Sequence, residues 1–152
     1  MIHEFKSYHG SVFAELIDES IIPIKLFRPD LGNNSYYTLN DKVALYIKHS
    51  TKRLTPWRFT FHTNHVQDMQ EIFAKYEYVF LVLVCGRDCI AVVERSEIEN
   101  LIPVNSPSLS WVSVQTSHNT SLTVEGSIGN LKRKLKKSKP FWRVYEILQL
   151  LS

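Results

Sequence analysis

Apolar and polar residues alternate along two neighbouring stretches of the chain in the manner of β-strands. Residues 42–50 and 57–62 each place their larger apolar side chains at every second position. Successive side chains of a strand point to opposite faces, so one face of each stretch is expected to lie against a core. Because only the loop 51–56 separates them, we predict a hairpin. Its buried side would contain Val43, Leu45, Ile47, Trp57, Phe59 and Phe61, with Lys48 and Arg58 more exposed.

Shorter apolar runs bounded by turn residues predict further strands. They cover residues 24–28, 36–39, 80–84, 90–93, 109–115 and 121–125. The turns predicted between them include the cluster Pro29–Asn34, the glycine at position 86 and the pair His118–Asn119. Short turns of this kind favour antiparallel pairing of the strands that they join.

Between the strands, apolar residues recur every three or four positions, which is the spacing of a helix. Helices are predicted over residues 11–19, from Asn64 to Tyr76, from Ser96 to Ile102 and from Ser138 to the last residues. The pairs Asn64–Gln67 and Ser96–Glu99 resemble N-terminal capping boxes. The order of elements predicts one α+β domain over residues 1–152, with a mixed or largely antiparallel sheet and about four helices.

Composition narrows the class of protein. The fractions of 44% hydrophobic and 22% charged residues are typical of a globular domain rather than a disordered chain. The longest apolar run, residues 78–85, is far shorter than the roughly 20 residues of a membrane span, and the N-terminus has no secretory pattern. Cys85 and Cys89 are interpreted as small buried side chains beside a turn. We therefore expect a cytoplasmic protein with no membrane partner.

Charge is unevenly distributed along the chain. Residues 1–131 carry 11 Lys and Arg against 14 Asp and Glu, a charge of −3. Residues 132–152 carry seven cations against Glu146, a charge of +6. The basic segment 132–139 has residues suited to binding phosphates or an acidic protein surface, although a solubilising, mobile segment is the alternative. The last helix is apolar nearly all round, which predicts core packing or, alternatively, a homodimer contact.

Two short motifs carry a family resemblance. Pro29-Asp30, followed by Tyr46-Ile47-Lys48, resembles the signature of the PD-(D/E)XK (restriction-endonuclease-like) nuclease family. In that family an acidic residue and an acidic-x-Lys strand hold Mg²⁺ and position the attacking water, often with help from a helical glutamate. The resemblance implies that Asp30 would be a metal ligand, Lys48 the lysine and Glu15 the helical carboxylate. It covers about half of the chain, residues 11–84.

The chain departs from this signature at Tyr46. The family has its second acidic ligand there, and a neutral phenol is a poor ligand for Mg²⁺. Asp41 is expected on the opposite face from Lys48 because of the strand alternation. We therefore expect no resident cofactor, and Mg²⁺ only if the protein is an active nuclease. His62 and His65 are interpreted as polar residues at an element boundary rather than metal ligands.

The same region supports a function that needs no metal. Cations next to a ring that can stack are typical of nucleic-acid binding. The candidate contacts are Lys48, Lys52, Arg53 and Arg58 on the predicted hairpin and Lys132, Arg133, Lys134, Lys136 and Lys137 in the basic segment. The sequence thus favours a non-catalytic nucleic-acid-binding protein with a degenerate nuclease-like core. The alternatives are an active Mg²⁺-dependent nuclease and a regulatory module that binds an acidic protein partner.

Overall fold

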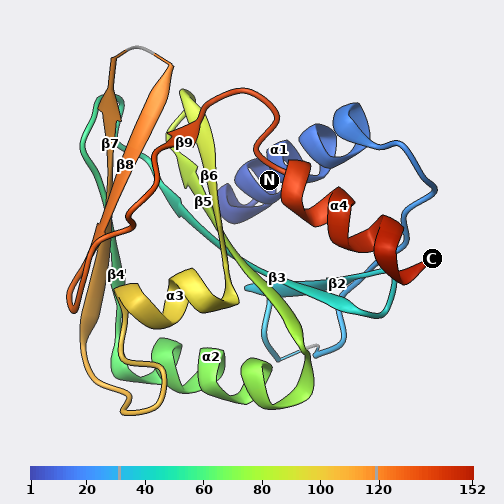
Figure 1. The fold of residues 1–152 in the computed structure, drawn as a ribbon, viewed down its shortest axis with the longest axis horizontal. Helices are drawn as coiled ribbons and strands as arrows, with labels where there is room; N and C mark the ends of the chain where they lie inside the picture. The colour runs from blue at the N-terminus through green and yellow to red at the C-terminus, as the bar shows by residue number, and fades with distance from the viewer. Residues whose placement is uncertain (31, 119) are drawn as a thin grey trace.

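The computed structural model describes residues 1–30, 32–118 and 120–152. Leu31, in the predicted turn cluster, and Asn119, in the predicted turn after His118, lie outside the described residues. The described chain forms four helices and two sheets (Figure 1), which confirms the α+β class. The helices are α1 (Glu4–Glu19), α2 (Thr63–Lys75), α3 (Arg95–Leu101) and α4 (Trp142–Leu151).

The first sheet, sheet A, forms the centre of the molecule (Figure 1). Its strands are β1 (Leu26–Phe27), β2 (Tyr36–Leu39), β3 (Val43–Ser50), β5 (Tyr78–Cys85) and β6 (Cys89–Glu94), in the order β1-β2-β3-β5-β6. Strands β3 and β5 are parallel, and every other neighbouring pair is antiparallel. The sheet is therefore mixed. The parallel pair requires a crossover, which the chain makes through β4 and α2.

The second sheet, sheet B, is antiparallel throughout and consists of β4 (Trp57–Phe61), β7 (Ser110–Ser117), β8 (Ser121–Gly126) and β9 (Leu135–Lys136), in that order. The predicted hairpin between residues 42–50 and 57–62 is therefore wrong. Both stretches are strands, but β3 lies between β2 and β5, whereas β4 pairs with β7. Alternation identifies the buried face of a strand and leaves its hydrogen-bonded partner undetermined.

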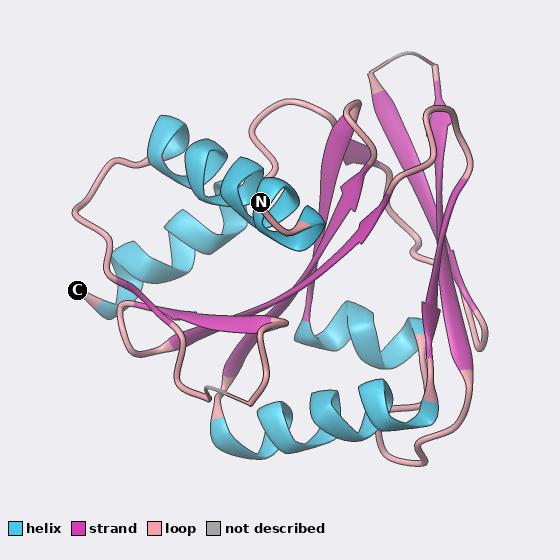
Figure 2. Cartoon of the chain, turned by 180° about the vertical axis from the view of Figure 1, so that it is seen from behind, coloured by secondary structure: helices cyan, strands magenta, loops and turns pink. Residues whose placement is uncertain are grey.

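Sheet A is covered on both faces, as Figure 2 shows. Helices α1 and α4 lie on one face, where Val43, Leu45 and Ile47 are buried. Helices α2 and α3 and the inner face of sheet B cover the other, where Trp57, Phe59 and Phe61 are buried with Ala44 and Tyr46. The six side chains predicted to be buried are thus confirmed. Strand β3 differs from the expectation in two respects: it has apolar neighbours on both faces, and Lys48, which was predicted to be exposed, is half-buried between β3 and β4.

Helix α4 packs within the same chain. It buries Val144, Tyr145, Ile147 and Leu148 on the α1 side of sheet A, and the Tyr145 hydroxyl donates a hydrogen bond to the backbone carbonyl of Leu16. This confirms core packing of the last helix. Trp142 and Leu150 stay exposed on its outer side. No described helix is long and apolar enough to cross a membrane.

Candidate nucleic-acid interface

The three residues implied by the nuclease resemblance do not meet in one site. Asp30 is exposed and precedes β2, and its Oδ1 accepts a hydrogen bond of 2.9 Å from the Gly32 amide. Lys48 follows Ala44 and Tyr46 on the face of β3 that is turned toward α2. Glu15 belongs to α1, which covers the opposite face of sheet A. The sheet itself therefore separates Glu15 from Lys48.

Tyr46 occupies the position at which the resemblance calls for a carboxylate. Its ring is buried and stacks on Phe61 with 6.5 Å between centroids, and its hydroxyl is hydrogen-bonded to the side chain of Ser35. Burial holds the pKa of this phenol well above its usual value, so it stays neutral and hydrogen-bonded at physiological pH. Tyr46 therefore serves to pack the core against Phe61.

The amino group of Lys48 is engaged within the chain. Its Nζ donates to the backbone carbonyl of Thr60, lies 3.3 Å from Nδ1 of His65 and stands 4.4 Å from the centroid of the Phe61 ring. Burial lowers the pKa of Lys48 to about 8, because a charged amine loses hydration there. Lys48 therefore cross-links β3 to β4 and is not presented to a nucleic acid.

His62 and His65 form a helix cap. The backbone carbonyl of His62 accepts a hydrogen bond of 2.9 Å from the His65 amide, and Nδ1 of His65 accepts a hydrogen bond of 3.2 Å from the His62 amide. The predicted capping pair Asn64–Gln67 is thus displaced by two residues, and α2 begins at Thr63. Among residues 1–30, 32–118 and 120–152, no group of three His, Cys, Asp or Glu side chains is placed to hold a metal ion.

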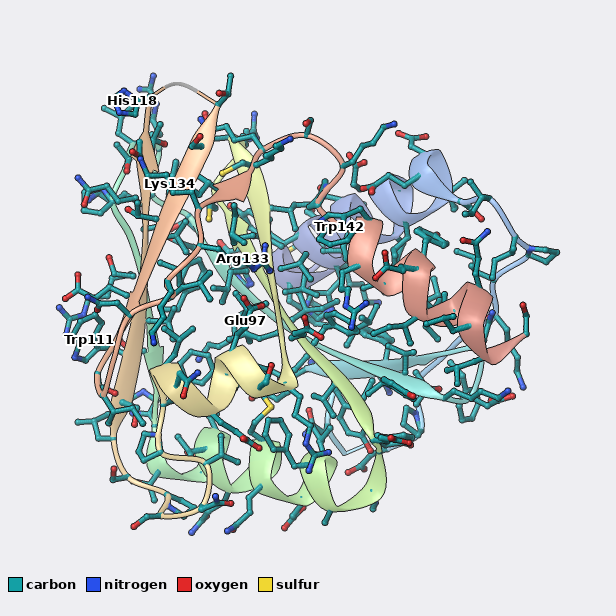
Figure 3. The ribbon with its side chains drawn as sticks, in the orientation of Figure 1. Glu97, Trp111, His118, Arg133, Lys134 and Trp142 are labelled. Carbon is teal, nitrogen blue, oxygen red and sulfur yellow. The ribbon has the colours of Figure 1, made fainter. Side chains whose placement is uncertain are left out.

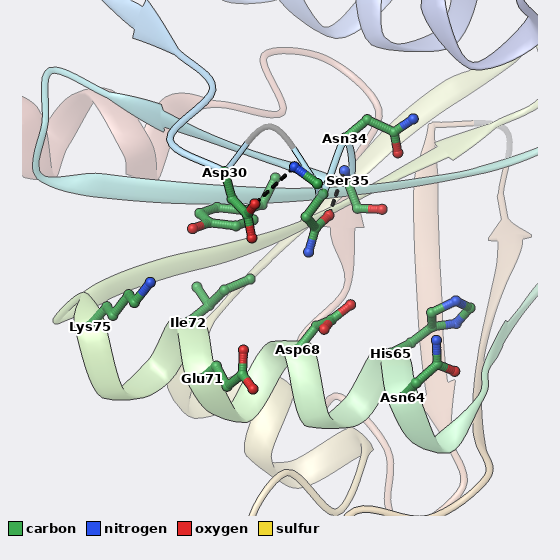
Figure 4. A pocket seen from close by; sticks show the side chains of 12 residues that line it. Asp30, Asn34, Ser35, Asn64, His65, Asp68, Glu71, Ile72 and Lys75 are labelled. Atoms are coloured by element: carbon green, nitrogen blue, oxygen red, sulfur yellow. Dashed lines mark hydrogen bonds between the residues drawn. The ribbon is translucent and has the colours of Figure 1, made fainter.

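A polar cleft of about 380 Å³ separates α2 from the residues that precede β2 (Figure 4). Asp30, Asp68 and Glu71 border it, together with one cation, Lys75. Burial and the nearby carboxylates of Glu71 and Asp30 raise the pKa of Asp68, because neighbouring negative charges disfavour its ionised form. Because phosphates are repelled by such a cleft, it does not suit the backbone of a nucleic acid.

The cations predicted to share one hairpin are dispersed. Lys48 is interior, whereas Lys52 and Arg53 are exposed in the loop before β4, where Nζ of Lys52 donates to the Pro56 carbonyl at 2.9 Å. Arg58 lies on β4, on the side turned away from both cores. The predicted grouping of Lys48 with Arg58 is therefore wrong, because their strands belong to different sheets.

The basic segment is divided into two sets by the alternation of β9. Leu135 is paired with Leu122 and buried, so its neighbour Lys136 faces the other side of the strand. Arg133 binds Glu97 of α3 through contacts of 2.6 and 2.9 Å, and Lys137 binds Asp88 at 2.8 Å. These two cations, both predicted to contact nucleic acid, are already neutralised within the chain.

The three even-numbered lysines of this segment are exposed to solvent. Lys136 is paired with Ser121 across β8–β9 and is exposed, as are Lys132 and Lys134. None of these three amines forms an ion pair with a residue that the structure describes. Since residues 135–136 pair with β8, the segment is an ordered sheet edge rather than the mobile segment considered as an alternative.

Sheet B has an uncovered outer face. Figures 1 and 2 show the helices and sheet A all on its other side. Burial alternates along its strands, with Trp57, Phe59 and Phe61 inside and Arg58 and Thr60 outside. The outward side chains are mostly small and polar, and include Ser113, Gln115, Ser117, Ser121 and Thr123. Such a face can accept a ligand without any rearrangement of the core.

An aromatic ring stands on this outer face. Trp111, on β7, points away from the body of the molecule (Figure 3), and the Arg58 guanidinium lies 4.4 Å from its ring centroid. Trp111 and Arg58 are diagonal neighbours, because β4 and β7 pair Arg58 with Ser113 and Thr60 with Trp111. We call the partly exposed Trp111 and the exposed Arg58, Lys134 and Lys136 together the sheet B platform. One carboxylate, Glu125, lies on the same face.

Trp111 was not among the residues that the sequence predicted to bind a ligand. The signal was present in the alternation of residues 109–115, where Trp111 shares a face with Ser113 and Gln115, opposite Val112 and Val114. A large aromatic ring on the polar side of a strand is a stronger indication of binding than one on the apolar side.

Comparison with known proteins gives no match: no protein-family model, no curated protein and no solved structure matches this chain. The candidate site is therefore argued from its own geometry and charge.

Proposed function

We propose that the protein binds nucleic acid without cleaving it, and that the sheet B platform is the binding surface. The observation that carries the proposal is the division of the basic segment by strand alternation. Lys136 pairs with Ser121 on the same side of sheet B as Arg58, and Lys134 is exposed two residues before it, whereas Arg133 and Lys137 are neutralised by Glu97 and Asp88. Three cations against Glu125 give this face a positive charge that complements phosphates.

The absence of cleavage is supported by the residues at the nuclease-like position. Tyr46 is committed to packing and to its hydrogen bond with Ser35, and the Lys48 amine to Thr60 and His65. Glu15 lies across the sheet, beside Glu19, whose pKa is raised to about 8 by burial and by its hydrogen bond to Glu15. These side chains offer no carboxylate pair to a hydrolytic centre around Lys48.

The test is a salt titration of binding to labelled oligonucleotides. The parent protein is compared with Lys134→Gln/Lys136→Gln and with a control of the same charge, Lys6→Gln/Lys75→Gln, whose exposed lysines lie on α1 and α2. Each phosphate contact contributes about 0.7 to 0.9 to the slope of log affinity against log salt. We expect the first variant to lose about 1.4 to 1.8 of that slope and the control to retain it.

Two results would contradict the proposal. The first is no detectable binding of the parent to mixed-sequence DNA or RNA at about 50 mM salt, where phosphate contacts are strong. The second is the same loss of affinity in the platform variant and in the control, because this would mean that net charge alone, and not the face of sheet B, determines binding.

A further inference from the structure

From the pairing of Trp111 with Arg58 we infer that the ligand of sheet B is single-stranded nucleic acid, with an unpaired base stacked on this pair. The inference rests on the proposed function and extends it from a charge preference to a class of nucleic acid. It uses two properties of the platform: a planar ring system that faces solvent, and its distance from the exposed lysines.

The Trp111 ring and the Arg58 guanidinium offer planar groups on which an unpaired base can stack. Trp111 is only partly exposed, and a guanidinium at 4.4 Å from its centroid places a second planar, positively charged group against the indole. Bases stack on indole rings and on guanidinium planes, and both are used to hold unstacked bases. In a duplex the bases are already stacked on one another, so the ring would have no base to contact.

The outer face of sheet B is a broad surface of four strands. The major groove of a DNA duplex is about 12 Å wide and admits a helix or a two-stranded ribbon. Sheet B presents four adjacent strands with short polar side chains, and neighbouring strands are about 4.8 Å apart. A surface of this width does not enter the groove, whereas a flexible single strand can lie along it.

Trp111 and Lys136 lie far apart on the outer face of sheet B. Trp111 lies near the start of β7, and Lys136 is joined through Ser121 to Ser117 at the end of β7. Ser117 is six positions after Trp111 along β7, which corresponds to about 20 Å at the rise of a strand. A chain of several nucleotides is needed to stack on Trp111 and also meet Lys134 and Lys136. Between them, hydroxyl and amide side chains such as Ser113 and Gln115 can bond to phosphate oxygens or base edges.

The experiment compares binding of 20-nucleotide oligo(dT), oligo(U) and a mixed-sequence 20-base-pair duplex by fluorescence anisotropy. Trp111→Ala and Trp111→Phe are compared with Trp142→Ala, which removes an exposed tryptophan from α4 (Figure 3). Stacking on an aromatic side chain contributes to affinity strongly enough that its removal weakens binding about 5- to 100-fold. We expect that loss for both single strands with Trp111→Ala, partial recovery with Trp111→Phe, and a change of less than about twofold with Trp142→Ala.

The salt dependence separates stacking from charge. Trp111→Ala is expected to lower single-strand affinity at every salt concentration without changing the slope, because it removes no phosphate contact. In a Trp142→Phe background, the indole fluorescence of Trp111 should be quenched by oligo(dT), and the quenching should disappear when Trp111→Phe is added. Thermal unfolding of each variant checks that the fold is retained.

The outcomes distinguish the two proposals. If the parent binds no nucleic acid, the proposed function itself is wrong. If the parent binds, but Trp111→Ala matches the parent on single strands or weakens duplex binding equally, then nucleic-acid binding stands and the single-strand inference is overturned. A difference between oligo(dT) and oligo(U) of more than about tenfold would assign the ligand to DNA or to RNA, since only RNA offers a 2′-hydroxyl.

Discussion

Arg133 donates hydrogen bonds to both carboxylate oxygens of Glu97, at 2.6 and 2.9 Å, and so links the edge of sheet B to helix α3. The next residue, Lys134, is exposed and forms no ion pair with a residue that the structure describes. Two adjacent cations in the same basic run therefore have different roles, one in holding the fold together and the other on the outer face.

This difference predicts that similar substitutions at Arg133 and Lys134 affect different properties, stability in the first case and nucleic-acid binding in the second. Arg133→Gln should lower the free energy of unfolding by about 1 kcal/mol, because a bidentate pair with a mostly buried carboxylate is lost at a partly exposed site. Lys134→Gln should change it by less than about 0.5 kcal/mol and weaken nucleic-acid binding instead. Urea denaturation and the oligonucleotide assay measure the two effects. The assignment would be wrong if Lys134→Gln were the more destabilising change.

Lys48 predicts a dependence of stability on pH. Its pKa is lowered to about 8 in the folded protein by burial and returns to about 10.5 on unfolding. Between these values the unfolded chain binds a proton that the folded chain does not, so this residue makes the free energy of unfolding rise with pH. Below about pH 8 the amine is charged in both states and its contribution is constant.

Lys48→Met provides the comparison, because it removes the titrating group and keeps most of the side-chain volume. The difference in unfolding free energy between parent and variant should increase in favour of the parent from about pH 8 to pH 10.5. Chemical denaturation at half-unit pH steps gives the curve. A difference that is flat over this window would mean that the folded-state pKa of Lys48 is not lowered.

Two glycines provide a matched test of backbone packing. A Cβ at Gly126 would lie 2.2 Å from the backbone carbonyl of Leu101, whereas a Cβ at Gly10 on α1 would meet nothing within 4 Å. Gly126→Ala should therefore destabilise the fold by about 2 to 3 kcal/mol, since β8 and α3 must move apart. Gly10→Ala should stabilise it by up to about 1 kcal/mol, because alanine favours the helix. Thermal denaturation of both variants compares them, and equal midpoints would contradict the close contact.

The nuclease alternative predicts a different behaviour, which is simple to measure. With Tyr46 at the second acidic position, we expect no Mg²⁺-dependent cleavage of DNA or RNA by the purified protein. Asp30→Ala and Lys48→Ala serve as controls for trace contamination, because contaminating activity would survive both substitutions. Robust cleavage that disappears in both variants would establish the nuclease and reject the proposed non-catalytic role.

Local patterns predicted most of the elements of this fold and the buried side of each strand. The alternation around Val43–Ile47 and Trp57–Phe61 sufficed, because the period of two is a property of a single strand. The partner of β4 was not predictable in this way. Its neighbour β7 is about 50 residues away in the chain, whereas the short loop 51–56 suggested β3 as the partner of β4. In the structure β5 occupies that place, because it pairs in parallel with β3.

The candidate site was predicted only in part for the same reason. Lys134 and Lys136 were recognised from charge alone, but the inward ion pairs of Arg133 and Lys137 depend on α3 and on the β5–β6 turn. Arg133 and Glu97 are 36 positions apart in the chain, and Lys137 and Asp88 are 49 positions apart. A local pattern of apolar and polar residues does not predict contacts over such separations. Similarly, His62 rather than Asn64 caps α2, because β4 ends one residue earlier, at Phe61.

The position of α4 has a consequence for synthesis on the ribosome. The apolar face of sheet A beneath α1, which includes Leu39 and Val82, is also covered by Phe141 and Val144. These residues emerge after every strand of both sheets has been made. A nascent chain that has completed sheet B therefore still exposes part of a hydrophobic layer, and the buried bond from Tyr145 to Leu16 can close only afterwards. Truncation before Trp142 should consequently yield a chain that is retained by chaperones or aggregates, even though both sheets are complete.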